Sequence, residues 1–297
     1  MPNSSPINSG IKVGINLLLW TDKPSPQHVT LLENIRGWGF DGVEFPVLAI
    51  EPSHIQILGR RCDELGLKRS CLVALSADTA DPSHPTQAFR DAALAQLKQC
   101  IDKSRDIGAD ILVGPFHQGL GRFTGKGPTS DELLRSAEVI REAAEYAATV
   151  HIDLAVEPLN RFEMFLTNTA EAAGQFVAKV DMPNVGILAD THHANIEEYQ
   201  VAESWRRVRG QIKHVHVSEN NRGIPGRGHA CSHEIFQMLR ETGYNRWITI
   251  EAFGTSVPGL IQPLRLWRQC FERQEDVAVL GLKHIHDSWN SMQSNRA

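Results

Sequence analysis

Four ionisable residues at the ends of successive apolar segments could together do chemistry. They are Glu157, Asp190, His216 and Glu251, at or near the ends of residues 152–157, 184–190, 212–217 and 247–252. A buried carboxylate is costly unless something binds it, and a cation would compensate these. Three carboxylates and one imidazole suit a hard or borderline divalent ion better than a structural zinc. We therefore predict one divalent metal ion, Mn²⁺ first, with Co²⁺ or Mg²⁺ as alternatives.

The elements that would position these residues follow from an alternation of short apolar runs with longer amphipathic stretches. The predicted strands are residues 12–19, 42–47, 68–75, 110–115, 152–157, 184–190, 212–217 and 247–252. Eight strands separated by helices is the count that closes a TIM-type barrel, whose active site lies at the C-terminal ends of the strands. A single acidic residue there is often only a helix cap, but four at successive strand ends favour a site.

The predicted fold is therefore α/β, a (β/α)8 TIM barrel forming a single domain over residues 1–297. Residues 1–10 are expected to be a tail, and one or two extra helices follow residue 260. A helix is predicted over 86–108, and Thr129 followed by Glu132 is a capping-box signature. A doubly wound sheet would need a glycine-rich phosphate fingerprint after the first strand, and LLLWTDKPSP is not one.

The bulk composition limits the partners and the compartment. The 297 residues carry 30 basic and 35 acidic side chains, a formal net charge of −5, which argues against nucleic-acid or anionic-membrane partners. Five scattered cysteines without a C-x-x-C pair predict a reducing, cytoplasmic setting. MPNSSPINSG has no apolar segment typical of a secretory signal, and no run approaches the roughly 18 apolar residues of a membrane helix.

Four segments carry a resemblance to a known family. AVEPLNRFE, NVGILADTHHANIEE, HVHVSENNRGIPGRGH and ITIEAFG resemble the ketose 3-epimerases, the D-tagatose and D-psicose 3-epimerase group of the xylose-isomerase-like TIM barrels. The resemblance spans the fifth to eighth predicted strands and extends weakly to NLLLW near the first. It implies an isomerase that inverts C3 of a ketose of the D-tagatose, D-psicose or L-ribulose type. It also implies a homo-oligomer, dimer or tetramer.

The resemblance also implies residue roles. Glu157, Asp190, His216 and Glu251 match the metal ligands, and Glu157 and Glu251 also match the acid–base pair on opposite faces of the substrate carbon. The other matched positions are Glu163, His193 and Arg222 for the ketone end of the sugar, and Trp20, Cys71 and the stretch from Gly114 to Phe116 for the pocket wall. A divalent ion would stabilise the enediolate formed when one carboxylate removes the proton. Arg222 and His193 would donate hydrogen bonds to the oxyanion, and Glu163 would orient a hydroxyl or a neighbouring side chain.

Plainer roles remain open for several of these residues. Glu163 and Arg222 could form surface salt bridges, and His193 could cap the helix that contains NIEE. His214 lies two residues before His216 on the same strand face, one layer deeper, where a satisfied core histidine is expected.

Two departures from the family pattern bear on the substrate. Members usually read LDTFHMN where this chain has ADTHHAN, so Ala189, His192 and Ala194 replace larger apolar residues and could admit a bulkier substrate. His117 and Gln118 stand where an aromatic residue often closes the pocket; they could bind sugar hydroxyls or simply be solvated.

Three alternative functions follow from the same residues. A metal-dependent sugar isomerase, or a keto-sugar lyase or dehydratase of the inosose-dehydratase-like or keto-glycoside-cleaving kind, would use the same enediolate. An endonuclease-IV-like DNA-repair enzyme would need several metals, more histidine ligands and a basic groove, against a net charge of −5. A non-catalytic sugar-binding barrel would not require carboxylates on both faces of the ligand, as Glu157 and Glu251 would provide.

Overall fold

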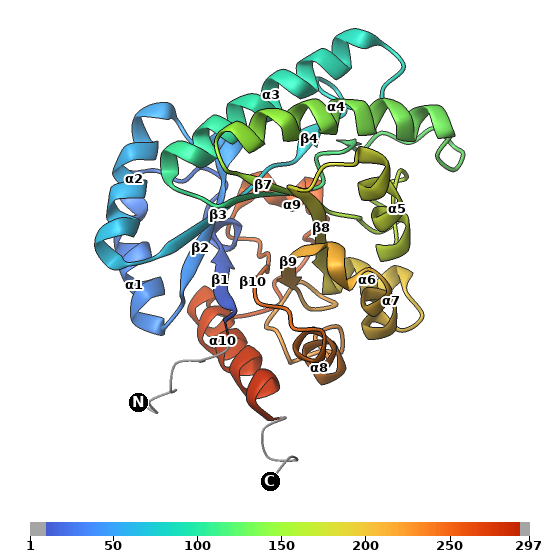
Figure 1. Ribbon diagram of the computed structural model, residues 1–297. Coiled ribbons are helices and arrows are strands. Elements are labelled where there is room, and N and C mark those ends of the chain that lie inside the picture. The colour runs from blue at the N-terminus through green and yellow to red at the C-terminus, as the bar shows by residue number, and fades with distance from the viewer. Residues whose placement is uncertain (1–9, 292–297) are drawn as a thin grey trace.

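The computed structural model describes residues 10–291 and contains a closed barrel of eight parallel strands (Figure 1). The barrel strands are β1 Lys12–Asn16, β2 Gly42–Pro46, β3 Lys68–Leu72, β5 Ile111–Gly114, β7 Asp153–Val156, β8 Val185–Asp190, β9 Ile212–Val217 and β10 Trp247–Ile250. They follow one another around the ring in chain order, and β10 pairs with β1 to close it. The predicted (β/α)8 barrel is confirmed. The predicted N-terminal tail lies outside the described residues except for Gly10.

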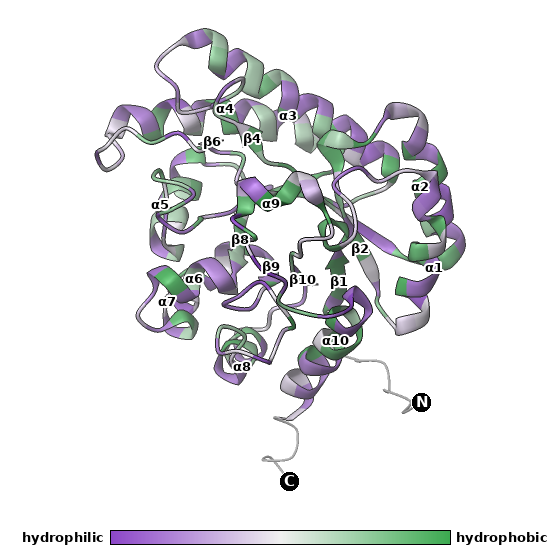
Figure 2. Ribbon diagram, turned by 180° about the vertical axis from the view of Figure 1, so that it is seen from behind, coloured by the Kyte–Doolittle hydropathy of each residue, from purple (hydrophilic) through white to green (hydrophobic). Residues whose placement is uncertain are grey.

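Helices surround the barrel, as Figure 1 shows. They are α1 Val29–Trp38, α2 Pro52–Leu65, α3 Gln87–Ile107, α4 Ser130–Thr149, α5 Ala170–Val180, α6 Thr191–Glu197, α7 Val201–Arg207, α8 His233–Glu241, α9 Pro258–Leu264 and α10 Gln274–Asn290. Figure 2, which views the molecule from behind, shows α9 across the centre of the ring. Leu260 and Leu264 of α9 pack against the buried cluster inside the barrel, which includes Phe253 just beyond β10, so α9 lies over the C-terminal mouth of the barrel. No helix within residues 10–291 is long and apolar enough to span a membrane.

Side chains on each strand alternate between the barrel interior and the layer beneath the helices. In β8, Leu188 belongs to the small interior cluster, whereas Ile187 and Ala189 belong to the larger cluster under the helices. Parallel strands in register share this alternation, so Asn16, Glu44 and Ser70, paired across β1, β2 and β3, all face inward. The alternation therefore decides which residue at a strand end can reach the barrel mouth.

Two strands are shorter than the apolar runs predicted. The run 12–19 leaves the barrel after Asn16, because the Asn16 side chain accepts the Leu18 N–H and starts a short 3-10 helix, Leu17–Leu19. The run 68–75 ends at Leu72; β4, Leu75–Ser76, pairs instead with β6, Gly119–Leu120, in a separate two-stranded sheet. Hydrophobicity alone did not reveal these two breaks.

Helix boundaries agree closely with the local sequence signals. α3 ends at Ile107, and Gly108 takes the left-handed conformation, with φ of 81°, that glycine favours after a helix. α5 begins after Thr169, which accepts the Ala172 N–H as the N-cap. One or two further helices were expected from residue 260 onward, and the structure has two: α9, which already begins at Pro258, and α10. The segment 265–273 between them is not helical.

The capping box at the start of α4 is confirmed and supports a stability prediction. Thr129 Oγ1 accepts the Glu132 N–H at 3.2 Å, and Glu132 Oε2 accepts the Thr129 N–H at 3.0 Å. We expect Thr129→Ala to lower the free energy of unfolding by about 1 kcal/mol in urea denaturation, because the Glu132 N–H loses its acceptor and the Glu132 carboxylate loses the Thr129 hydroxyl. Thr149→Ala, at the other end of α4, should cost less, since its hydroxyl only bonds back to the Tyr146 carbonyl. An equal loss in both variants would contradict a specific contribution from the cap.

The lower, N-terminal end of the barrel is closed by Trp247. This residue is 2% exposed, and its indole Nε1 donates to Asp110 Oδ1 at 2.9 Å. A Cβ on Gly42 would lie 2.5 Å from the Trp247 ring and 2.3 Å from the Lys68 carbonyl oxygen, so the floor can close only with glycine at this position.

Candidate metal centre and active site

The four strand-end residues converge at the mouth of the barrel. Glu157 follows β7, Asp190 ends β8, His216 lies near the end of β9 and Glu251 follows β10, and these four strands are neighbours around the ring. His216 Nδ1 lies 3.3 Å from Glu251 Oε1, 3.8 Å from Asp190 Oδ2 and 4.0 Å from Glu157 Oε1. We call these four residues the quartet. One potential ligand atom from each lies within 4.8 Å of all the others.

The quartet fits a divalent cation by its chemistry as well as by its spacing. All four side chains are buried, with exposures between 0% and 4%. Among the described residues, Glu157 Oε1, Asp190 Oδ2 and His216 Nδ1 have no hydrogen-bond partner, which is costly for buried polar atoms. A divalent ion that prefers oxygen ligands would give these three atoms a partner. Three carboxylates and one imidazole are a ligand set that suits such an ion.

Burial and the charges of neighbouring groups shift the pKa values of the quartet residues in different directions. Burial, and then the nearby Glu251, raise the pKa of Glu157 well above its usual value. Burial also raises the pKa of Asp190, to about 6. Burial would raise the pKa of Glu251 too, but His216 and Arg222 outweigh it and hold this pKa below its usual value. Two carboxyl groups at one point, with pKa values displaced in opposite directions, are typical of acid–base sites.

The backbone at the strand ends fixes the quartet carboxylates. The N–H groups of Glu157 and Glu251 donate to the carbonyls of Gly114 and Val217, each at 3.1 Å. Asp190 is the N-cap of α6, and its Oδ1 accepts the His192 and His193 N–H groups at 2.6 and 3.0 Å, which leaves Oδ2 directed at the quartet. Asp190, and not His193, therefore caps the helix that contains NIEE.

Arg222 and His193 lie against the quartet. Arg222 is 8% exposed, which rules out a surface salt bridge, and Nη1 donates to Glu251 Oε2 at 2.8 Å and to Ser218 Oγ at 2.9 Å. Its Nη2 lies 3.0 Å from His193 Nε2, and the same His193 nitrogen is 3.7 Å from Glu157 Oε1. Arg222 itself has a positive φ of 60°, so the loop after β9 turns its guanidinium back over the mouth. The sequence predicted both residues at the site, and the structure brings them together.

Glu163 lies farther out, in a pocket above Arg222. Asn160 Nδ2 donates to Glu163 Oε1 at 2.9 Å, and a carboxylate oxygen of Glu163 lies within 4.8 Å of ring nitrogens of His192 and His193. The pocket has a volume of about 220 Å³ and is also lined by residues 264–268 after α9. Trp267 stands in this wall with 67% of its surface exposed. Arg222 links this pocket to the quartet, because it lines the pocket and donates to Glu251; we call it the entrance pocket.

Two of the three residues that were expected to line the pocket wall lie elsewhere. The Trp20 ring stacks on Trp38 of α1, with centroids 6.1 Å apart. Cys71 is buried beside Ser104 of α3, because it follows the inward-facing Ser70 and so points to the opposite side of β3. Phe116 is fully buried in the same layer under the helices. Cys71 and Phe116 therefore do not face the quartet, and a role of Trp20 in the pocket wall stays a prediction.

His117 and Gln118 neither face the pocket nor contact solvent, so both expected alternatives are wrong. His117 Nε2 lies 2.6 Å from Thr167 Oγ1, and burial lowers the His117 pKa to about 3. Gln118 Oε1 accepts the N–H groups of Phe165 and Leu166 at 3.3 and 2.9 Å. Both side chains are 0% exposed, and their hydrogen bonds hold the loop after β5 against the loop after β7.

The expectation that Ala189 and Ala194 widen the substrate pocket is also wrong. Both line a cavity of only about 10 Å³ on the outer side of β8, where Trp205 of α7 is a neighbour. Ala189 points outward because the next residue, Asp190, points inward. Of the three departures in ADTHHAN, only His192 lines the entrance pocket, and its Nδ1 lies 3.1 Å from the Glu219 carbonyl oxygen.

Sequence reasoning missed a buried group directly beneath the quartet. Glu44 of β2 is 0% exposed, and its Oε1 lies 2.8 Å from His216 Nε2. Its Oε2 lies 3.1 Å from Nε2 of His214. His214 is buried as expected, but it is not the satisfied core histidine that was predicted, because neither ring nitrogen has a hydrogen-bond partner among the described residues. A signal was present: a lone glutamate inside the apolar run GVEFPV must find a partner in the core.

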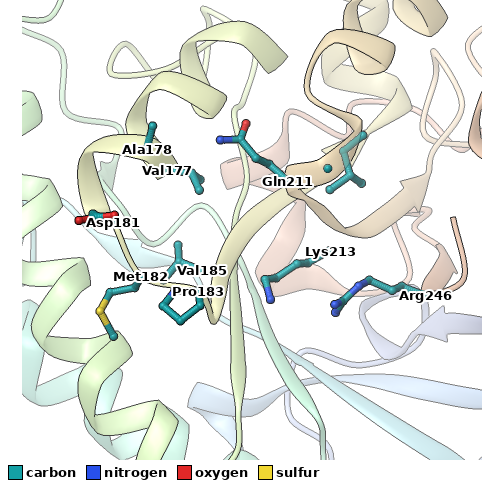
Figure 3. Close-up of a pocket in the computed structure, with 11 residues that line it drawn as sticks. Val177, Ala178, Asp181, Met182, Pro183, Val185, Gln211, Lys213 and Arg246 are labelled. Carbon is teal, nitrogen blue, oxygen red and sulfur yellow. The ribbon is translucent and has the colours of Figure 1, made fainter. Parts of the chain in front are cut away.

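A hollow of about 500 Å³ lies at the opposite end of the barrel, where α5 meets the starts of β8 and β9 (Figure 3). Its basic residues Lys213 and Arg246 each contact Asp153 Oδ2 at 3.0 Å. TIM barrels carry their active sites at the other end of the strands, and the basic groups here already have a partner. The entrance pocket above Arg222 is therefore the better candidate for substrate.

Comparison with known proteins gives consistent matches along the chain. A family model described as a xylose isomerase-like TIM barrel matches residues 32–276. A protein of Ruminiclostridium cellulolyticum named D-psicose 3-epimerase is 38% identical over 264 residues, 87% of this chain and 89% of the relative. A protein of Synechocystis sp. named probable ketose 3-epimerase is 29% identical over 285 residues, 95% of this chain and 98% of the relative. A solved structure of L-ribulose 3-epimerase has a TM-score of 0.91 at 29% identity and covers 96% of each chain.

Proposed function

The chain belongs to the xylose isomerase-like TIM barrel family, within its ketose 3-epimerase group, and from this membership we propose that it inverts C3 of a ketose. The proposed enzyme is a metal-dependent carbohydrate 3-epimerase, and its substrates are ketoses of the D-tagatose, D-psicose or L-ribulose type. The observation that carries the proposal is the quartet itself, in which Glu157 and Glu251 reach one buried point from two different strands.

Glu157, Asp190, His216 and Glu251 would hold one divalent ion through Oε1, Oδ2, Nδ1 and Oε1, which are the atoms that face one another. When bound, an ion such as Mn²⁺, with Co²⁺ or Mg²⁺ as alternatives, supplies positive charge that stabilises the enediolate. The buried atoms without hydrogen-bond partners support this assignment.

Glu157 and Glu251 are proposed as the two acid–base groups. One carboxylate removes the proton from C3, and the electron pair of that C–H bond forms the enediolate with the C2 carbonyl. The other carboxyl group then donates a proton to the opposite face of C3, and the enediolate returns to a ketone. Their position supports this division, since the two carboxyl groups reach one buried point from β7 and β10, two different strands of the ring.

Arg222 and His193 are proposed to hold the ketone end of the sugar, because both present nitrogen atoms beside the quartet. A guanidinium fixed over the site favours the negative charge that develops on the C2 oxygen. Glu163 lines the entrance, where its carboxylate can accept a hydrogen bond from a sugar hydroxyl.

A screen of ketoses in D₂O tests the proposal directly. The Mn²⁺-loaded protein is incubated with D-tagatose, D-psicose or L-ribulose, and NMR follows deuterium incorporation and product formation. We expect deuterium at C3 together with the C3 epimer. Exchange at C1 with an aldose product would instead establish the isomerase alternative, and elimination from a keto-inositol or keto-glycoside would establish the lyase. The lyase alternative has lost the support it drew from Ala189 and Ala194, which face away from the site.

The exposed Trp267 gives a prediction for substrate entry. An aromatic side chain in a pocket wall offers apolar area to the carbon face of a sugar. We expect Trp267→Ala to raise KM by roughly fivefold with little change in kcat, which corresponds to about 1 kcal/mol of lost contact. Steady-state kinetics measures both. Tyr199→Ala, a fully exposed aromatic residue outside this pocket, is the matched control and should leave both parameters unchanged.

A further inference from the structure

Glu44 is hydrogen-bonded to three side chains beneath the quartet and lies close to a fourth, His214. Its Oε1 is 3.0 Å from Asn16 Nδ2 and 2.8 Å from His216 Nε2. Its Oε2 accepts from Ser70 Oγ at 2.9 Å and lies 3.1 Å from His214 Nε2. Because the Asn16 amide and the Ser70 hydroxyl both donate to it, Glu44 acts as a hydrogen-bond acceptor at this position.

An acceptor at this position decides which nitrogen of His216 carries hydrogen. The Nε2 nitrogen must donate to Glu44, so in the neutral ring the lone pair belongs to Nδ1. Nδ1 is the nitrogen that faces Glu251, Asp190 and Glu157. The bond at Nε2 also fixes the plane of the ring, because His216 has no exposed surface and lies edge to face against His214.

Glu44 also reaches a second member of the quartet. The Asn16 amide nitrogen that donates to Glu44 lies 3.4 Å from Glu251 Oε1. Asn16 is itself held in place, since its Oδ1 accepts the Leu18 N–H at 2.8 Å. One buried carboxylate thus contacts His216 directly and Glu251 through one amide.

We propose that Glu44 is a positioning residue for the metal, which fixes the ring and tautomer of His216 so that Nδ1 is presented as a ligand. This inference rests on the proposed function, because it assumes that the quartet holds the ion. Glu44 touches neither the proposed ion nor the substrate and acts through His216 and Asn16. A glutamine at this position would bring an N–H₂ group among the three hydrogen-bonded side chains, and at least one of them would lose its acceptor.

Isothermal titration of metal-free full-length protein with MnCl₂ tests the proposal without reference to activity. We expect Glu44→Gln to weaken Mn²⁺ binding by about 10- to 100-fold, the usual effect of removing a partner of a metal-bound histidine. Ser70→Ala is the matched control, because it removes another buried hydrogen bond to Glu44 but leaves the contact to His216 intact. It should bind Mn²⁺ within about threefold of the wild type. Thermal unfolding of both metal-free variants then separates lost stability from lost affinity.

The outcomes distinguish this inference from the proposed function. If Mn²⁺ binds neither the wild type nor any variant, or binds Asp190→Asn as tightly as the wild type, the quartet is not the metal site. If the wild type binds Mn²⁺ and Asp190→Asn does not, but Glu44→Gln binds as tightly as the wild type, the role of Glu44 is overturned. Should Glu44→Gln not fold, ¹⁵N NMR of Mg²⁺-loaded wild type decides: we expect the N–H coupling at Nε2 of His216, and a hydrogen on Nδ1 would overturn the proposal.

Discussion

Replacing either Glu157 or Glu251 by glutamine is expected to lower the rate of C3 epimerisation by at least about 10²- to 10⁴-fold. Inversion needs a base on one face of the carbon and an acid on the other, and a carboxamide is neither at neutral pH. Both residues also belong to the quartet, so each change removes a ligand atom as well.

The two variants should differ from each other in a way that a structural defect would not produce. With one carboxylate left, any residual exchange of the C3 proton with D₂O should be confined to one epimer of the pair. The other variant should show the opposite preference. NMR of each epimer separately measures this, and Glu203→Gln, on the exposed surface of α7, should behave as the wild type. Full turnover in both Glu157→Gln and Glu251→Gln would remove the two-base scheme.

Removal of the metal is the second change with a large expected effect. Treatment with EDTA should abolish epimerisation, and Mn²⁺ or Co²⁺ should restore it, because the enediolate charge would otherwise develop beside three buried carboxylates. Binding should also stabilise the fold, by about 2.7 kcal/mol when free Mn²⁺ is at 100 times its Kd. Thermal unfolding with and without Mn²⁺ measures this gain independently of activity.

Asp190→Asn provides the control for metal removal. A neutral amide at Oδ2 weakens the site, while the side-chain oxygen can still cap α6 through the His192 and His193 N–H groups. The variant should therefore fold, but its melting temperature should respond little to Mn²⁺. Activity that survives EDTA unchanged, with no shift in melting temperature on adding Mn²⁺, would contradict a metal at the quartet.

The sequence predicted the barrel and the quartet because both depend on regular features. Eight apolar runs set the strand count, and the end of a buried strand is a place where a carboxylate needs a partner. The same reasoning failed where the direction of a side chain decides its role. Ala189 and Cys71 lie close in the chain to inward-facing residues but point the opposite way.

Glu44 shows what the strand register adds. It pairs with Asn16 and Ser70 across adjacent strands, so all three face the interior at one level. The register cannot be derived from hydrophobicity, because every residue of GVEFP is buried and the run shows no alternation. Burial of His117 and Gln118 was equally unpredictable, since their partners belong to a loop about 50 residues further along the chain.

Trp247 closes the barrel at the N-terminal end of the strands, so a ligand at the quartet cannot pass through the barrel to that end. Its indole donates to Asp110 and packs against Gly42, so under the proposed function both epimers would reach and leave the quartet from the C-terminal end of the strands. The two epimers would then compete for the quartet, and each would inhibit the conversion of the other. Because epimerisation would run in both directions, this competition would slow the net conversion of one epimer into the other as the mixture nears equilibrium.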